Sequence, residues 1–121
     1  MNMRNTDILM IDDNRILRKV VQRYLTRRGL GIITVATAAA AQRVLARHSP
    51  RLLLVDMQLP DASGLTLVRN FAARGITVIA ITADSSPRCE HELHHAGAAA
   101  CLIKPFPLPV LAQAISHALA D

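Results

Sequence analysis

The stretch RLLLVDMQLPDASGL, residues 51–65, places a carboxylate at the end of a run of four apolar residues. Leu52 to Val55 have the continuous hydrophobicity that is typical of a strand buried on both faces of a parallel sheet. Asp56 follows this run directly. A buried carboxylate without compensation is strongly unfavourable. Asp56 must therefore be paired, metal-bound or reactive.

Length and composition limit the class of protein. The chain has 121 residues, of which 51% are hydrophobic, and we expect one domain over residues 1–121. No apolar run approaches the roughly 20 residues that span a bilayer, and residues 1–7 are polar, without an apolar signal region. Cys89 and Cys101 form neither a CxxC motif nor a disulfide framework. We therefore expect a soluble, cytoplasmic protein with no membrane contact.

Strand-like apolar runs alternate five times with segments of helical spacing. The strand runs are residues 8–11, 32–36, 52–55, 78–82 and 100–103. The first helical segment places Leu17, Val21 and Leu25 on one side and precedes Gly29, a residue typical of helix C-termini. The last helical segment extends over residues 108–119. This alternation predicts an α/β fold, because neighbouring parallel strands need crossover connections.

Polar residues end or directly follow four of the five strand runs. Asp12 and Asp13 follow the first run and Asp56 follows the third. Thr82 closes the fourth run and Lys104 follows the fifth. Open parallel sheets bind their ligands beyond the carboxyl ends of the strands. We therefore expect these five side chains to share one site.

The predicted site has the side chains that phosphoryl transfer needs. Three carboxylates in one crevice repel one another, which raises the proton affinity of at least one of them unless a cation is present. Mg²⁺ suits such a site because it binds one or two carboxylates together with waters and phosphate oxygens. A lysine and a threonine hydroxyl add a charge and a donor for phosphate oxygens. The set predicts phosphoryl transfer onto Asp56, with catalysis by positioning and charge neutralisation.

Four motifs make the chain similar to the receiver domains of bacterial response regulators. They are ILMIDDN at 8–14, LLLVDMQLPDASGL at 52–65, VIAITA at 78–83 and CLIKPF at 101–106. Each motif is weak alone, but their order and spacing are specific and cover nearly the whole chain. The resemblance implies a flavodoxin-like, doubly wound five-stranded parallel sheet of order 2-1-3-4-5 with five helices. It also implies a function in two-component signal transduction or a phosphorelay.

The resemblance implies a role for each polar residue at the strand ends. Asp56 resembles the phosphoacceptor, which takes a phosphoryl group from the phosphohistidine of a histidine kinase or a histidine phosphotransfer protein. Asp13, Asp56 and the backbone carbonyl of Gln58 resemble the Mg²⁺ ligands, and Asp12 acts on the ion mainly through water. Lys104 resembles the lysine that holds the phosphoryl oxygens. Such a domain is a signalling module and not an enzyme, since it catalyses only its own phosphorylation and dephosphorylation and regulates a downstream output protein or domain.

The expected switch departs from the family pattern at one position. Thr82 resembles the switch hydroxyl, Ala83 leaves room behind it, and Pro105 resembles a cis proline. Cys101 stands in the fifth strand where the family usually has Tyr or Phe. We therefore expect the phosphorylation chemistry to be kept and the aromatic part of the switch to be missing or replaced. A packed, inert thiol is favoured over a redox role for Cys101 or Cys89.

Other polar positions allow two interpretations each. Gln58 and Asp84 either orient water at the phosphoryl group or are solvated loop residues. His91 and His95 are four residues apart, a spacing that can bind zinc. Surface histidines near a helix C-terminus are the more common explanation of this pair.

The first helix is strongly basic. The net charge is +5, and of the 14 Lys and Arg residues six lie between positions 15 and 28, without an acidic residue among them. A solvated helix face is the usual explanation of such a run. The resemblance also implies that this helix meets the histidine-bearing partner, with Ile16, Leu17 and Arg18 at the contact.

Two alternative functions stay open from the sequence. A basic nucleic-acid-binding module is disfavoured because one Tyr and two Phe offer few rings for stacking on bases, and we expect no direct nucleic-acid contact. A small α/β phosphatase-like enzyme usually needs a second aspartate two residues after its nucleophile. Gln58 stands at that position, which disfavours this enzyme.

Overall fold

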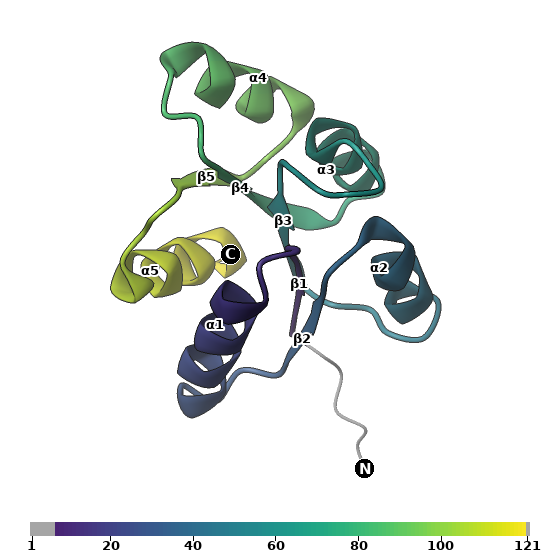
Figure 1. Ribbon diagram of the computed structural model, residues 1–121, viewed down its shortest axis with the longest axis vertical. Helices are drawn as coiled ribbons and strands as arrows, with labels where there is room; N and C mark the ends of the chain where they lie inside the picture. The colour runs from purple at the N-terminus through teal and green to yellow at the C-terminus, as the bar shows by residue number, and fades with distance from the viewer. Residues whose placement is uncertain (1–6, 121) are drawn as a thin grey trace.

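The computed structural model describes residues 7–120 and shows strands and helices in regular alternation (Figure 1). The elements are β1 (Ile8–Ile11), α1 (Arg15–Arg27), β2 (Ile32–Val35), α2 (Ala38–Leu45), β3 (Leu52–Asp56), α3 (Gly64–Ala73), β4 (Thr77–Thr82), α4 (Pro87–Ala96), β5 (Ala100–Ile103) and α5 (Leu108–Leu119). The five strands form one parallel sheet of order β2-β1-β3-β4-β5. The predicted doubly wound α/β fold is confirmed, and each strand ends within one residue of its predicted bounds.

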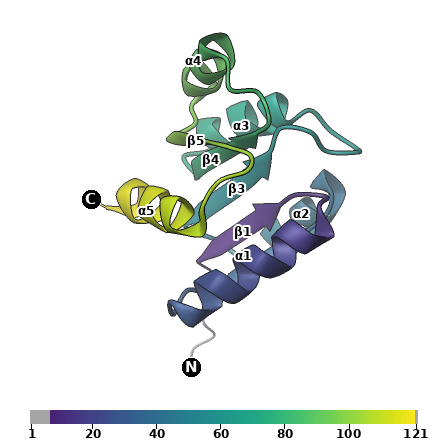
Figure 2. The same cartoon turned by 60° about the vertical axis from the view of Figure 1, so that its left-hand side comes forward.

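Helices cover both faces of the sheet, as Figures 1 and 2 show. Alternate residues of each strand enter two separate apolar layers. On one face, Leu9 of β1 belongs to the layer that contains Phe71 of α3. On the other face, Met10 belongs to the layer that contains Leu25 of α1 and Leu111 of α5. All of these residues are at most 1% exposed. Because both faces of these strands are buried, their sequences are continuously apolar.

Short polar side chains fix the starts of four helices. Asn14, Thr37, Ser63 and Ser86 each accept a hydrogen bond from the backbone N–H three residues further on, at distances between 3.0 and 3.3 Å. Such caps satisfy backbone donors that the first helical turn leaves unpaired. Each of these residues follows a strand closely in sequence. The caps therefore also hold the loops at the carboxyl edge of the sheet.

Helix α1, with 13 residues, is the longest helix between residues 7 and 120. Over the same residues no helix is long and apolar enough to cross a membrane. Arg28 is the C-cap of α1, and Gly29 follows it with a φ of 86°. This left-handed conformation favours glycine, as the sequence predicts for the end of this helix.

Gly64, the first residue of α3, lies against the loop that leaves β3. A Cβ atom at this position would lie 2.6 Å from the carbonyl oxygen of Asp56 and would overlap the backbone of Met57. Glycine is the residue that lets two backbones approach this closely. The start of α3 is therefore held directly beside the end of β3.

We expect Gly64→Ala to lower the free energy of unfolding by about 1–3 kcal/mol, because the added methyl group pushes the β3–α3 loop away from α3. Gly29→Ala is the matched control: its left-handed conformation is unfavourable for alanine by about 1–2 kcal/mol, but nothing lies within 4 Å of the added Cβ atom. Urea denaturation measures both losses. NMR amide shifts at Asp56 and Met57 should change in Gly64→Ala alone, and unchanged shifts there would contradict the contact.

Candidate functional site

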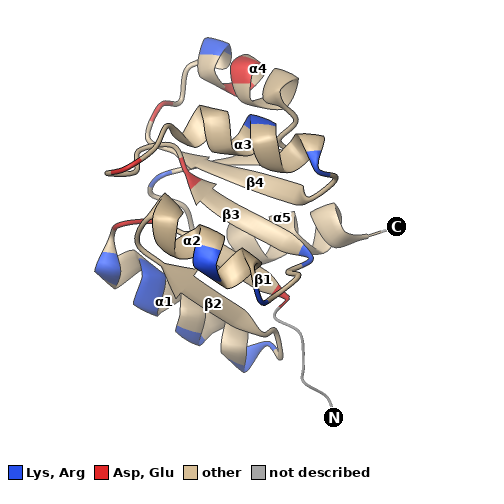
Figure 3. Ribbon diagram, turned by 90° about the vertical axis from the view of Figure 1, so that its right-hand side faces the viewer, with Lys and Arg blue, Asp and Glu red and all other residues tan. Residues whose placement is uncertain are grey.

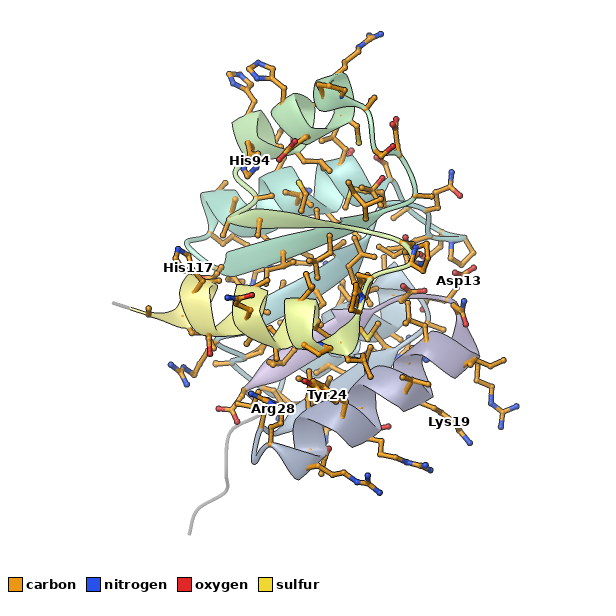
Figure 4. The ribbon with its side chains drawn as sticks, turned by 90° about the vertical axis from the view of Figure 1, so that its left-hand side faces the viewer. Asp13, Lys19, Tyr24, Arg28, His94 and His117 are labelled. Atoms are coloured by element: carbon orange, nitrogen blue, oxygen red, sulfur yellow. The ribbon has the colours of Figure 1, made fainter. Side chains whose placement is uncertain are left out.

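The carboxyl ends of β1, β3, β4 and β5 meet at one edge of the sheet. Figure 3 shows acidic residues at the tip of β3 and in the loop after β1, and Asp13 is labelled at this edge in Figure 4. Asp12 and Asp56 are 0% and 5% exposed, whereas Asp13 is exposed. One oxygen atom from each of the three carboxylates lies within 4.8 Å of the others. The structure thus brings the three predicted carboxylates together.

The Lys104 ammonium lies between the two buried carboxylates. Its Nζ atom is 3.0 Å from Asp12 Oδ2 and 3.4 Å from Asp56 Oδ2, and it donates a hydrogen bond to Asp56. The closer contact, with the fully buried Asp12 Oδ2, is an ion pair. Lys104 therefore balances part of the charge of both buried carboxylates.

Burial raises the pKa of Asp56 above its ordinary value of 3.8. The backbone N–H of Gln58, which donates to Asp56 Oδ1 at 3.2 Å, opposes this rise, the charge of Asp12 adds to it, and Lys104 also opposes it. Burial lowers the pKa of Lys104, but its contacts with Asp12 and Asp56 outweigh burial and the net shift is upward. Lys104 therefore stays charged, and the ionised form of Asp56 remains disfavoured.

The donor set fits Mg²⁺. Three ionised carboxylates and one ammonium sum to a formal charge of −2, which one divalent cation would neutralise. Mg²⁺ binds carboxylate oxygens and keeps several of its waters. A cavity of about 330 Å³, lined by Asp13, Asp56, Gln58 and Lys104 among others, leaves room for them. The backbone carbonyl of Gln58 stays a predicted ligand.

Thr82 ends β4 and is 5% exposed. Its Oγ1 atom accepts a hydrogen bond from the Asp84 N–H at 3.0 Å and lies 3.8 Å from Cys89 Sγ. Within residues 7–120, the Thr82 hydroxyl has no hydrogen bond to Asp56 or Lys104. The hydroxyl therefore faces α4 and not the carboxylates.

The remaining predicted positions lie around the same edge. Ala83 lines the cavity of the site, and the Lys104–Pro105 peptide bond is cis. Asp84 does not line this cavity; its Oδ1 accepts a hydrogen bond from the Ser86 N–H at 2.8 Å, which lowers the pKa of Asp84. Gln58 therefore borders the site, whereas Asp84 lies outside its cavity and holds the start of α4.

Two loop contacts have no signal in the sequence. Arg18 Nη1 donates to the carbonyl oxygen of Asp12 at 2.8 Å. The two carboxylate oxygens of Asp61 accept from the backbone N–H groups of Ala38 and Ala39 at 2.9 and 3.0 Å, which lowers the pKa of Asp61. Both contacts join a side chain to backbone groups of another loop or helix. Arg18, expected at the partner contact, is thus also a support of the β1–α1 loop.

Cys101 lies beside Ala80 in the β4–β5 register and packs against the apolar layer that α3 and α4 cover. Burial raises the pKa of its thiol to about 11, and the charge of Glu90 and the nearby Cys89 add to the rise. The thiolate is the reactive form of cysteine. At neutral pH the thiol of Cys101 therefore stays protonated, and its packing agrees with the predicted packed cysteine.

The paired histidines lie on the surface of α4. The rings of His91 and His95 stack with their centroids 6.3 Å apart, and both residues are exposed. In the described segment, residues 7–120, the aspartate cluster is the one group of three or more His, Cys, Asp or Glu residues close enough to hold a metal ion. Nothing in the structure supports the zinc interpretation of the histidine pair.

The basic helix α1 has an apolar groove beside it, which we call the α1 groove. It has a volume of about 410 Å³ and is lined by Ile16, Lys19, Val20, Arg23, Tyr24, Arg27 and Leu108. Ile16 is 75% exposed and Val20 is 43% exposed, and Figure 4 shows Lys19 directed away from the body of the protein. Leu17, expected at the partner contact, packs partly against the core instead.

Comparison with known proteins identifies relatives of this chain. The family model described as "Response regulator receiver domain" matches residues 8–116. The transcriptional regulatory protein KdpE of Mycobacterium tuberculosis is 34% identical over 104 residues, which cover 84% of this chain and 45% of KdpE. The polar-differentiation response regulator DivK of Brucella ovis is 28% identical over 118 residues, which cover 94% of this chain and 96% of DivK. The crystal structure of the receiver domain of NtrX from Brucella abortus is 26% identical with a TM-score of 0.86, covering 93% of this chain and 98% of that chain.

The chain belongs to the response regulator receiver family. It is a receiver domain of two-component signal transduction, a signalling module rather than an enzyme of the ordinary kind. The chain spans about half the length of KdpE. Receiver domains bind Mg²⁺ at an acidic cluster of the kind that Asp12, Asp13 and Asp56 form, and their partners in general are histidine kinases and output proteins or domains.

We expect Asp56→Asn to stabilise the receiver domain at pH 7 when no divalent cation is present. Folding raises the pKa of Asp56, so its ionised form destabilises the fold. The loss of folding stability begins near pH 3.8, grows as the pH rises through the folded-state pKa, and is complete above that pKa. The asparagine has no charge, and Lys104 keeps its contact with Asp12. Urea denaturation in EDTA at several pH values measures the difference.

The gain from Asp56→Asn should disappear toward pH 3.8, and Mg²⁺ should stabilise the wild-type domain more than the variant. Asp13→Asn makes the same charge change at an exposed position and should change the stability less. A variant that is less stable than the wild type at pH 7 in EDTA would contradict the destabilising effect of the Asp56 charge.

Proposed function

We propose that this receiver domain accepts a phosphoryl group on Asp56 from the phosphohistidine of a histidine kinase or a histidine phosphotransfer protein, in the cytoplasm. The single observation that carries the proposal is the position of Asp56. Its carboxylate lies among two further carboxylates within 4.8 Å, 3.4 Å from the Lys104 ammonium, and lines a cavity of about 330 Å³. An output protein or domain would respond to the modified form.

Asp12, Asp13, Asp56 and the backbone carbonyl of Gln58 would hold Mg²⁺. When bound, Mg²⁺ supplies charge neutralisation to the carboxylates and to the phosphoryl oxygens. A carboxylate oxygen of Asp56 forms the new bond to phosphorus while the bond between phosphorus and the partner's imidazole nitrogen breaks, and the electron pair of that bond returns to the nitrogen. The Gln58 N–H orients the Asp56 carboxylate through Oδ1. Lys104 Nζ would donate to the oxygens of the transferred group.

Acetyl phosphate with Mg²⁺ should add one phosphoryl group to the wild-type domain and none to Asp56→Asn, because the acceptor oxygen is replaced by an amide. Lys104→Ala should slow the reaction about hundredfold, the typical loss on removal of one positioned donor to a developing charge. Intact mass at successive times measures all three, and EDTA should stop the reaction. Arg69→Ala, an exposed cation of α3, is the control and should react as the wild type. Modification of Asp56→Asn at the wild-type rate would contradict the assignment.

The α1 groove supports recognition of the phosphohistidine partner. Ile16 and Val20 form an exposed apolar centre, and Lys19 and Arg23 stand at its rim. An apolar centre with a charged rim is the usual composition of a protein interface, and complementary charge raises the association rate. The groove therefore suits a helical partner surface with apolar and acidic residues. Arg18 supports the loop that carries Asp12, so it is not suited to a test of docking.

Reversal of charge in the variant Lys19→Glu, Arg23→Glu should slow phosphoryl transfer from a phosphorylated histidine kinase about tenfold or more, because charge steering is lost. Transfer from acetyl phosphate should stay at the wild-type rate, since neither residue lines the cavity of the site. Arg69→Glu, Arg74→Glu makes the same charge change on α3 and its C-cap and serves as the control. Equal transfer rates from the kinase to both double variants would contradict docking at the α1 groove.

A further inference from the structure

The thiol of Cys89, in the first turn of α4, faces the hydroxyl of Thr82. The two atoms, Sγ and Oγ1, are 3.8 Å apart, a distance suited to a weak hydrogen bond that involves sulfur. The backbone N–H of Cys89 donates to Ser86 Oγ at 3.2 Å, which is the capping bond of α4. Cys89 thus connects the end of β4 to the start of α4.

The present contacts of Thr82 turn its hydroxyl away from the phosphoacceptor. A hydroxyl has one proton to donate and two lone pairs. One lone pair accepts from the Asp84 N–H at 3.0 Å, and the contact with Cys89 uses a further position. Among residues 7–120, neither Asp56 nor Lys104 makes a hydrogen bond with this hydroxyl. For the hydroxyl to reach a phosphoryl group on Asp56, it must leave Cys89.

The neighbouring strand has no aromatic ring that could follow this movement. Cys101 lies beside Ala80 in the register of β4 and β5. Side chains alternate along a strand, so Ala80, Thr82 and Cys101 lie on the same face of the sheet. The Cys101 thiol is small, packed and protonated. It has neither the size nor the charge to report a movement of Thr82, whereas Cys89 is already in contact with it.

Space for a response exists beside this contact. Thr82 and Cys89 both line a cavity of about 420 Å³, which also includes Met57 and Leu65 from the β3–α3 segment and Leu93 of α4. Cys89, in the first turn of α4, lines this space, so the turn has room on that side. The contact between Thr82 and Cys89 therefore restrains an element that has room to move.

We propose that Cys89 is a positioning residue that holds Thr82 away from Asp56 and passes the movement of Thr82 to the first turn of α4. The inference rests on the proposed phosphorylation of Asp56. A phosphoryl group on Asp56 draws the Thr82 hydroxyl toward itself, and the contact with Cys89 is lost. The first turn of α4 is then released from β4. The signal is transmitted by α4 and not by an aromatic residue of β5.

Alkylation of Cys89 by iodoacetamide measures this contact directly. The chain has two cysteines, so Cys101→Ser leaves Cys89 as the single thiol. Beryllofluoride with Mg²⁺, a stable substitute for the phosphoryl group, should raise the alkylation rate of Cys89 about two- to fivefold, as expected from the loss of one weak hydrogen bond. Asp56→Asn should abolish the rise. In Thr82→Ala, alkylation should be fast with and without beryllofluoride.

Amide hydrogen exchange tests whether the movement reaches α4. In the wild-type domain, beryllofluoride should speed exchange in the first turn of α4. In Cys89→Ala, these amides should exchange faster from the start and respond little, and Cys89→Ser, which keeps a hydrogen-bonding side chain, should recover part of the response. Cys101→Ser, the matched control on β5, should respond as the wild type. Equal responses in Cys89→Ala and the wild type would overturn the inference.

Fluorine NMR of the same samples separates this inference from the function on which it rests. Bound beryllofluoride without a change in Cys89 alkylation overturns the role of Cys89 alone. If the wild-type domain binds no beryllofluoride and gains no mass from acetyl phosphate, phosphorylation of Asp56 is overturned, and the role of Cys89 with it.

Discussion

The structure of the site depends on one interaction, the Lys104 ammonium between the buried carboxylates of Asp12 and Asp56. Burial and like charge both oppose ionisation of Asp56, and a single ammonium compensates for only part of the negative charge. The charge that remains suits a divalent cation, and a cation together with Lys104 suits a phosphoryl group. The property that makes the site unfavourable for folding is therefore the property that suits it to the proposed phosphorylation.

The parallel sheet makes this concentration of charge possible. Crossover helices return each strand in the same direction, so the ends of β1, β3, β4 and β5 meet at one edge. Ile11 and Val55 are fully buried and directly precede Asp12 and Asp56. The same strands thus supply the core and hold the carboxylates in place. Gly64 adds to this by allowing α3 to start against the backbone of Asp56.

The receiver fold is kept in this chain with Cys101 at the β5 position where the resemblance predicts an aromatic residue. A small thiol at Cys101 fits the buried β5 strand, where it packs against the layer under α3 and α4. The hydroxyl of Thr82 contacts Cys89 on α4 instead. In the proposed role of Cys89, the response passes from Thr82 to α4 and the carboxylates need no change.

The sequence by itself determined the order and type of the elements, and that three aspartates lie together at the carboxyl edge of the sheet. Apolar runs, caps and glycines are local signals, so the bounds of β1, β5 and α5 were predicted correctly, and the carboxyl ends of parallel strands must meet, so Asp12, Asp13 and Asp56 were predicted as one cluster. Only the tertiary structure decided which atoms touch. Arg18 on the Asp12 carbonyl and the thiol that faces Thr82 depend on side-chain rotamers and on distances of a few ångström, and spacing along the chain does not encode these.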